Sequence, residues 1–283
     1  MSRNTTRKTA GLSKKKPTPA DPVAETASNI GLNFSTPTEH VELPSGGKFY
    51  PETHPLHGKE TLEIKFMTAK EEDILTSKNL LRKGLAIERL LESIVLNKEI
   101  NPSSLLVGDR NAILVASRIT GFGPEYNTQI TCPACNTTSE TIFDLSEVTT
   151  KESEIPPEVT LTDTGTFIFE LPVTGVHVET RLMTGTDEKR LLSTKETKKK
   201  HKLAETPLTD QLKLIIKSIN GHEDRTTVHQ FIEHMPSRDT RHLRSMYEKL
   251  TPNIDMTLEF ECSNCSHETD VEVPFTTSFF WPK

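Results

Sequence analysis

The residues with the clearest chemical potential are four cysteines arranged in two Cys-x-x-Cys pairs. The pairs lie in "TCPAC" (131–135) and "ECSNC" (261–265), 126 residues apart, and they contain every cysteine of the chain. Four thiolates form the closed tetrahedral ligand set of a structural zinc site. We therefore predict one shared Zn²⁺ ion bound by four ligands: Cys132, Cys135, Cys262 and Cys265.

Other thiol chemistry stays open on the sequence alone. The sulfurs could form two disulfides or stay free, and four thiolates also suit an iron–sulfur cluster or a mononuclear iron. A mixed ligand set in which His267 replaces a cysteine is a further alternative. Paired cysteines in a reducing cytoplasm are more often metal ligands than disulfides, which favours a metal. A redox-active dithiol is disfavoured because, apart from His267, no basic residue lies close to either pair to lower a thiol pKa.

The sequences around the two pairs resemble each other. Apolar and polar residues alternate in "YNTQITCPACNTTSETIFDL" and in "MTLEFECSNCSHETDVEVPF", both before and after the cysteines. Alternation with a period of two predicts strands, so each pair is expected in the turn of a hairpin. Such a hairpin is a zinc knuckle, and two knuckles would together supply the four sulfurs.

The elements before the first pair are expected to be one strand and several helices. "ETLEIKFM" (60–67) alternates as a strand does, and "TAKE" (68–71) fits a capping box with Thr68 as N-cap and Glu71 reaching back. Apolar residues at helical spacing predict helices over 85–96 and 108–121. In the second of these, Asp109 is the expected N-cap and Gly121 the expected residue after the C-cap.

The second half of the chain follows the same plan. "HVETRLMTGTDEKRLL" (177–192) aligns with "TLEIKFMTAKEEDILT" (61–76) at an offset of 116 residues. "SRDTRHLRSMYEKL" (237–250) aligns with "VGDRNAILVASRIT" (107–120) at an offset of 130, which also superposes the cysteine pairs. A lysine-rich insertion, "KETKKKHK" (195–202), helps to explain the change of offset. The order of matches predicts an internal duplication.

These observations define the expected organisation as α+β with two related lobes. Residues 1–38 are a basic, Ser-, Thr- and Pro-rich arm with few large apolar side chains, and are expected to be disordered. Residues 39–150 form the first repeat and its knuckle, and residues 151–283 form the second repeat, its knuckle and an aromatic tail. Each repeat is a strand or hairpin, helices and a knuckle, and the shared metal site joins the two.

Composition and motifs offer no catalytic site. The 283 residues carry a net charge of −6, and no apolar run approaches the length of a membrane span. "SGGK" (45–48) lacks the spacing of a P-loop, and "GFGPEY" (121–126) lacks the third glycine of a dinucleotide fingerprint. The ten histidines are scattered and no nucleophile–base pair stands out. We therefore expect that the protein is not an enzyme.

The C-terminal "VPFTTSFFWPK" concentrates aromatic side chains that are poorly suited to water. They are expected either to fold back against the knuckles or to contact a partner, and the partner-contact candidates are Phe279, Phe280 and Trp281.

Three segments also resemble a known family. "ELPSGGKFYP", "VGDRNAILVASRITGFGPEY" and "PFTTSFFWP" resemble the small baseplate-hub proteins of T4-like contractile-tailed bacteriophages, as ordered landmarks over residues 41–283. The resemblance implies a structural or assembly role in the virion tail baseplate, after assembly in the host cytoplasm. The implied partners are other hub proteins and the tape-measure protein.

Two other functional classes are kept as alternatives. A zinc-ribbon protein could bind nucleic acid through the arm and the 195–202 insertion, although the rest of the chain is acidic and neither knuckle has interleaved basic and aromatic residues. An iron–sulfur protein is the third hypothesis.

Overall fold

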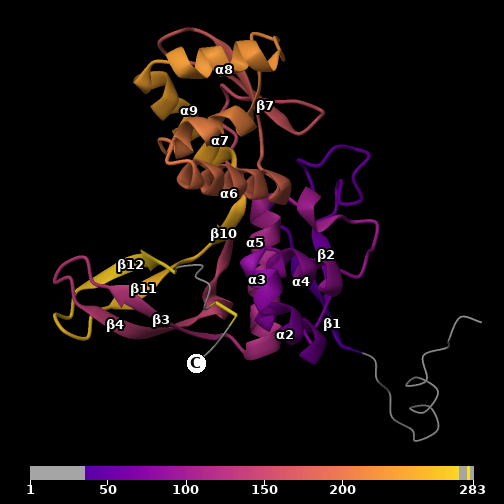
Figure 1. Ribbon diagram of the computed structural model, residues 1–283, viewed down its shortest axis with the longest axis vertical. Helices are drawn as coiled ribbons and strands as arrows, with labels where there is room; N and C mark the ends of the chain where they lie inside the picture. Colours follow the sequence, from indigo (N-terminus) through magenta and orange to yellow (C-terminus); the bar gives the residue numbers. More distant parts are fainter. Residues whose placement is uncertain (1–35, 274–278, 281–283) are drawn as a thin grey trace, which may run out of the picture. The chain divides into compact units, whose positions relative to one another are not determined.

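The computed structural model describes residues 36–273 and 279–280. The chain divides into two units, Met1–Pro37 and Thr38–Lys283, and every element below belongs to the second. The predicted α+β class is confirmed: helices accompany several small antiparallel sheets (Figure 1). No described helix is long and apolar enough to cross a membrane. The predicted arm (1–38) lies almost wholly outside the described residues.

The chain begins with a hairpin whose loop is long and structured. β1 (Thr38–Glu42) pairs with β2 (Thr61–Lys65) in antiparallel register, with Val41 opposite Leu62. Leu62 and Ile64 are buried while Thr61 is exposed, as the alternation predicts. The loop between the strands contains the "SGGK" segment, which is a turn with positive φ at both glycines.

The first half has the helix predicted to begin after Thr68, the two helices predicted over 85–96 and 108–121, and one short helix that was not predicted. They are α2 (Ala69–Thr76), α3 (Lys78–Arg82), α4 (Ala86–Ile94) and α5 (Val107–Phe122), with a 3₁₀ turn η1 (Pro102–Ser104) before α5. Val95, just after α4, forms a bridge with Ile64 at the edge of β2. The burial of Leu90, Leu91 and Ile94 confirms the predicted apolar face of α4.

The predicted capping box at the start of α2 is confirmed. The Glu71 carboxylate accepts hydrogen bonds from the Thr68 backbone N–H (2.9 Å) and hydroxyl (2.6 Å), and pairs with Lys65 Nζ at 2.7 Å. Burial raises the pKa of Glu71, but the bonds from Lys65, Ser93 and Thr68 outweigh it and lower the pKa to about 2. The carboxylate is therefore held ionised inside the protein.

The predicted ends of α5 are wrong. Leu106 is the N-cap, and the helix runs through Gly121 to Phe122, where Gly123 caps it with φ of 83°. That conformation favours glycine, so the second glycine of "GFG" ends the helix. Asp109 lies within the first turn of the helix and is not its N-cap.

Asp109 instead holds the β1–β2 loop. One carboxylate oxygen accepts the Ser45 backbone N–H (2.9 Å), and the other accepts the hydroxyls of Ser45 (2.6 Å) and Tyr50 (2.8 Å). Asp109 is fully buried, and burial raises its pKa although these three bonds lower it. A buried polar group is tolerated when its hydrogen bonds are made, so this contact ties the loop to α5.

The second half is built around a four-stranded sheet. Its strands, in spatial order, are β6 (Thr160–Leu161), β7 (Thr166–Glu170), β8 (His177–Arg181) and β9 (Ile216–Ile219). The helices are α6 (Gly185–Lys200), α7 (Pro207–Ile215), α8 (Arg225–His234) and α9 (Ser237–Leu250). α9 coincides with the segment 237–250 that aligned with 107–120, and the lysine-rich insertion forms the last turns of α6 and the residues just after it.

The second half repeats two of these polar contacts. Asp187 caps α6 by accepting from the Thr184 backbone N–H and hydroxyl, both at 3.0 Å, and pairs with Arg181 at 2.7 and 2.8 Å. Asp239, in the first turn of α9, is fully buried and accepts the Val173 N–H (2.8 Å), the Thr174 N–H (3.1 Å) and the Thr174 hydroxyl (2.8 Å). Val173 and Thr174 lie in the loop between β7 and β8.

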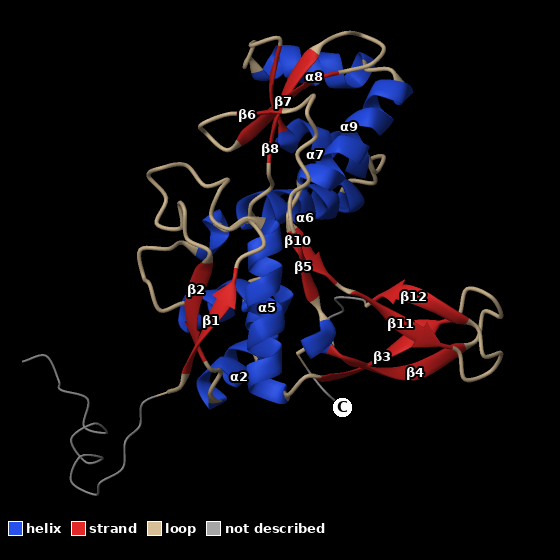
Figure 2. Ribbon diagram, turned by 180° about the vertical axis from the view of Figure 1, so that it is seen from behind, coloured by secondary structure: helices blue, strands red, loops and turns tan. Residues whose placement is uncertain are grey.

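The two halves of the chain are joined by backbone contacts. β5 (Thr149–Lys151) pairs with β10 (Asn253–Asp255), and the Val107 N–H at the start of α5 donates to the Met183 carbonyl at 3.0 Å. A side chain at Gly108 would collide with the Pro252 carbonyl and come within 2.9 Å of the Asn253 Cα, so glycine permits this close approach. The remaining strands are β3 (Glu125–Thr131), β4 (Thr138–Asp144), β11 (Thr257–Glu261) and β12 (Glu268–Glu272), which Figure 2 shows as two hairpins of red arrows.

Replacing Asp109 tests whether the loop depends on the buried carboxylate. Asp109→Asn leaves one acceptor oxygen where two were used, and its NH₂ group cannot accept a hydrogen bond. In either orientation of the amide, at least one of the three donors from Ser45 and Tyr50 therefore loses its acceptor. We expect the substitution to lower the free energy of unfolding by about 2 kcal/mol, and Asp239→Asn to do so by a similar amount. Urea denaturation measures both. The control is Asp73→Asn at an exposed site on α2, and equal midpoints for Asp109→Asn and the control would refute the role.

Candidate metal centre

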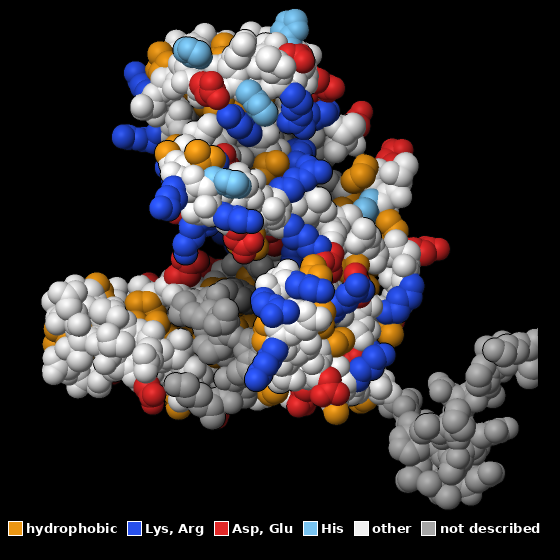
Figure 3. All heavy atoms as spheres, in the orientation of Figure 1, with side chains coloured by type: hydrophobic (Ala, Val, Ile, Leu, Met, Phe, Trp, Pro, Cys, Tyr) orange, Lys and Arg blue, Asp and Glu red, His pale blue; other side chains and the backbone are white. Residues whose placement is uncertain are grey.

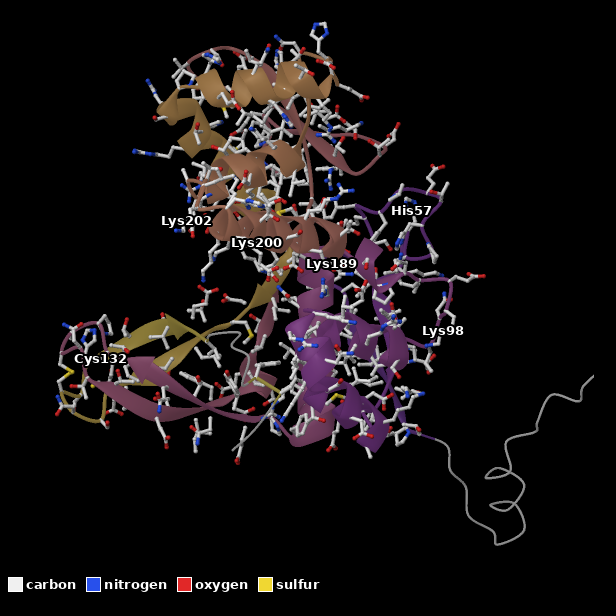
Figure 4. All side chains as sticks on the ribbon, in the orientation of Figure 1. His57, Lys98, Cys132, Lys189, Lys200 and Lys202 are labelled. Carbon is white, nitrogen blue, oxygen red and sulfur yellow. The ribbon has the colours of Figure 1, made fainter. Side chains whose placement is uncertain are left out.

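Two hairpins carry the cysteine pairs, as predicted. The first joins β3 (Glu125–Thr131) to β4 (Thr138–Asp144), and the second joins β11 (Thr257–Glu261) to β12 (Glu268–Glu272). Alternate residues of β3 and β11 are buried, among them Tyr126, Ile130, Leu258 and Phe260. Each Cys-x-x-Cys segment forms the turn of its hairpin, and Figure 4 shows Cys132 at this end.

The two turns have the same backbone hydrogen bonds. Cys132 N–H donates to the Thr137 carbonyl (2.9 Å), and Asn136 N–H donates back to the Cys132 carbonyl (2.9 Å). In the second turn Cys262 N–H donates to the His267 carbonyl (3.0 Å), and Ser266 N–H donates to the Cys262 carbonyl (2.8 Å). Asn136 and Ser266, one after the second cysteine of each pair, both adopt positive φ, at 56° and 53°. The paired turns therefore present their sulfurs in the same way.

The four sulfurs meet at one point. Cys132 Sγ lies 3.7 Å from Cys265 Sγ, Cys135 Sγ lies 3.7 Å from Cys262 Sγ, and all four are within 4.8 Å of one another. All four are free thiols, so the alternative of two disulfides is not what this structure contains. A tetrahedron with metal–sulfur distances of about 2.3 Å has edges of about 3.8 Å, close to the two shortest separations. The geometry is compatible with a single metal ion among the sulfurs.

The thiols cannot all ionise easily without a cation. Hydrogen bonds from Thr137 and from the Asn264 amide lower the pKa of Cys135 to about 5, and the N–H groups of Asn264 and Cys265 lower that of Cys262. For Cys265, the His267 N–H lowers the pKa, but the neighbouring thiols, above all Cys135, and burial raise it to about 12. A bound cation would remove this conflict by stabilising all four thiolates.

The cluster supplies ligands but no reactive groups. Within the described residues, it is the only group of three or more His, Cys, Asp or Glu side chains placed to hold a metal ion. His267 is not part of it; its carbonyl contributes to the turn. Four protein ligands complete a tetrahedral shell and leave no position for a substrate or water. A metal ion held by all four sulfurs would therefore suit a structural site.

Part of the C-terminal aromatic segment is folded against the first hairpin. Phe279 and Phe280 are 1% and 4% exposed, and the Phe279 ring meets Tyr126 edge-on at 5.2 Å. Folding back, one of the two expected arrangements, thus describes these two side chains. Their contact with a partner stays a prediction, and Trp281 lies outside the described residues.

Sequence reasoning missed Arg118, which holds this segment in place. The side chain is 1% exposed on α5, and its guanidinium donates to the carbonyls of Phe279 (2.8 Å), Gly123 (2.7 Å) and Glu125 (2.9 Å). Burial lowers its pKa, and the three carbonyls, of which that of Gly123 is at the C-terminus of α5, partly balance the charge. The available signal was its position four residues after buried Leu114, on an apolar helix face.

The comparison with known protein families gives a match over nearly the whole described chain. Residues 36–281 match the model of the family described as T4 bacteriophage base plate protein. The chain belongs to this family. No curated protein and no solved structure matches the chain significantly.

Membership of the T4 base plate family gives the protein its location and general class. It is a component of the virion tail baseplate, assembled in the host, and its family points to a structural role with protein partners. The resemblance drawn from the sequence is therefore confirmed. The family does not assign a role to the four cysteines, which the structure brings together independently.

Metal binding can be followed by the protons it releases. Addition of one equivalent of a divalent metal ion at pH 7 should release fewer than four protons. The reason is that Cys135 is already largely ionised before the metal binds, whereas Cys265 loses its proton only when the metal binds. Affinity should rise with pH as the remaining thiols lose their protons. Calorimetry in buffers of different ionisation enthalpy measures the proton count. Release of four protons, or no binding to the fully reduced chain, would contradict this account of the thiols.

Proposed function

We propose that this base plate protein is a structural and assembly component of the tail hub, with a structural Zn²⁺ bound by Cys132, Cys135, Cys262 and Cys265. The observation that carries the proposal is the convergence of four free sulfurs, from hairpins far apart in sequence, in a family of baseplate proteins. A closed four-thiolate site adds binding free energy to folding and leaves no site for catalysis. The hairpins would then be zinc knuckles.

We further propose that the two halves descend from one duplicated unit. The cap of α2, made by Lys65, Thr68 and Glu71, recurs 116 residues later as Arg181, Thr184 and Asp187. The bridge from Ile64 to Val95 corresponds to the pairing of Thr180 with Ile216.

The two buried aspartates support the same duplication. Asp109 and Asp239 are 130 residues apart, the offset of the cysteine pairs, and each ties the first turn of a helix to the loop of a preceding hairpin. Because these contacts are side-chain specific, their repetition supports common descent more strongly than matching elements alone. On this proposal each copy contributes one knuckle, and the metal joins the copies.

The proposal that one zinc ion joins the two halves of the chain has a direct test. Cys132→Ser should lose the metal and lower the melting temperature of the whole chain, including its second half, because Cys262 and Cys265 lose their shared ion. Elemental analysis with an absorption spectrum gives the metal, with one colourless zinc per chain expected and a coloured iron–sulfur cluster as the contrary result. Ser139→Ala on β4, outside the turn, is the matched control. If the second half melts unchanged in Cys132→Ser, the shared site is wrong.

The hub role predicts association with proteins rather than nucleic acid. Co-expression with the phage's other hub proteins and its tape-measure protein should give a complex that survives size-exclusion chromatography. Binding to duplex and single-stranded DNA, measured at two salt concentrations, should be weak. Sub-micromolar affinity that falls steeply with salt would instead support the nucleic-acid alternative.

A further inference from the structure

The second half of α6 carries a basic surface that has no partner among the described residues. It comprises Lys195, Lys199, Lys200 and Lys202, all exposed, and no ion pair involving them occurs in the described chain. Lys and Arg side chains gather over this helix in Figure 3, and Figure 4 labels two of the four, Lys200 and Lys202.

The basic surface is held in a fixed position. Lys198, on the same helix, turns toward α7 and contacts both oxygens of Asp210 at 2.8 and 2.6 Å. This contact anchors the end of α6, although only Gly185 and Asp187 of the helix are buried. The attraction of cations to a helix C-terminus accounts for some lysines in the last turn. It does not account for Lys195 or for Lys202, which lies beyond the helix.

Exposed apolar side chains flank the basic surface. Leu192 is 63% exposed and lies three residues before Lys195 on the helix, and Leu203 is 59% exposed just after Lys202. Residues three and seven positions after Leu192 share its side of the helix, so Leu192, Lys195 and Lys199 form one stripe. A stripe of this composition suits an acidic protein surface with some apolar character.

The same chain carries an acidic surface on its second hairpin. The outward side of β11 and β12 presents five exposed carboxylates: Glu259, Glu261, Glu268, Asp270 and Glu272. The register places Glu259 opposite Asp270 and Glu261 opposite Glu268. Like charges directly opposite each other destabilise a strand pair, and none of the five has an ion-pair partner within the described residues.

The first hairpin shows that these carboxylates are not needed to form the structure. Its register pairs Gln129 with Glu140 and Thr131 with Thr138, at the positions that correspond to the like-charged pairs. Both hairpins present their cysteines through the same turn. The first has one like-charged pair, Glu125 opposite Asp144, at the end far from its cysteines, whereas the second has two such pairs next to its turn. The basic stretch is likewise confined to the second half, because α2, which follows the corresponding cap, ends at Thr76. Both charged surfaces are thus additions to the shared plan.

We propose that the basic surface of α6 binds the acidic surface of β11–β12 on a second copy of this chain. Each copy would contact one neighbour through its basic surface and another through its acidic surface. Such heterologous contacts either close the copies into a ring or continue as an open chain of copies. Opposite charges would set partner and register, and apolar contact by Leu192 and Leu203 would add to them.

The test uses reversal of each surface. The first variant, Lys195→Glu/Lys199→Glu/Lys202→Glu, has two acidic surfaces, and the second, Glu259→Lys/Asp270→Lys/Glu272→Lys, has two basic ones. The full-length protein, loaded with metal, is followed by light scattering at low and high salt. Wild type should exceed the 31.8 kDa monomer at low salt and approach it at high salt. Each variant alone should bind itself about tenfold or more weakly, whereas an equimolar mixture should associate again.

The matched control for the first variant is Lys59→Glu/Lys78→Glu/Lys83→Glu, which makes the same change in net charge at exposed lysines of the first half. It should associate as wild type does, and unchanged metal content should show that each variant is folded. Three results would overturn the proposal. The wild type could stay monomeric at low salt, the mixture of variants could stay monomeric, or all three variants could behave alike. Rescue only when both sets of changes are in one chain would place the contact within a chain, and binding of α6 to DNA by a monomer would assign it to nucleic acid.

Discussion

The convergence of four thiols is the constraint on which the rest of the structure depends. Sulfurs from two distant segments lie within 4.8 Å of one another, and their pKa values diverge because adjacent thiolates repel. Such a cluster is stable only if the two hairpins are held in register by the rest of the chain, by an ion, or by both. The pairing of β5 with β10 and the hydrogen bonds from Arg118 to three carbonyls hold the ends of the hairpins that are far from the sulfurs.

The buried aspartates show how a chain with a low apolar content still fixes its loops. Asp109 and Asp239 each use three hydrogen bonds to hold a loop that would otherwise have little to bury. A buried carboxylate is costly unless it is fully hydrogen-bonded, so these contacts are specific as well as stabilising. Their recurrence at matching positions supports the proposed duplication, since an apolar contact could be replaced by many residue types while a three-bond carboxylate could not.

The sequence predicted what depends on local pattern. The capping box at Thr68, the apolar face of α4 and the two hairpins follow from cap chemistry, helical spacing and alternation, all of which act over a few residues. Long-range contacts were not readable in this way. Asp109 was expected to be an N-cap because only its local sequence could be read. Its actual partners, Ser45 and Tyr50, lie about sixty residues away. The chain changes from α7 to β9 between Ile215 and Ile216 because residues 216–219 pair with β8, and a short apolar run does not by itself distinguish helix from strand. Arg118 was missed because its partners are carbonyl groups, which leave no mark in a sequence.

The separation of the paired cysteines has a consequence for synthesis. Cys132 and Cys265 are 133 residues apart, and Arg118 meets a carbonyl 161 residues further on. A ribosome adding about 5–20 residues per second needs roughly 7–27 seconds to pass from one cysteine pair to the other. For that interval the first hairpin is outside the ribosome with two thiols and an unfilled apolar side. The first half of the chain therefore cannot complete its folding until the second half has been synthesised. A chaperone, or a metal ion bound early, would protect the first hairpin most within this interval.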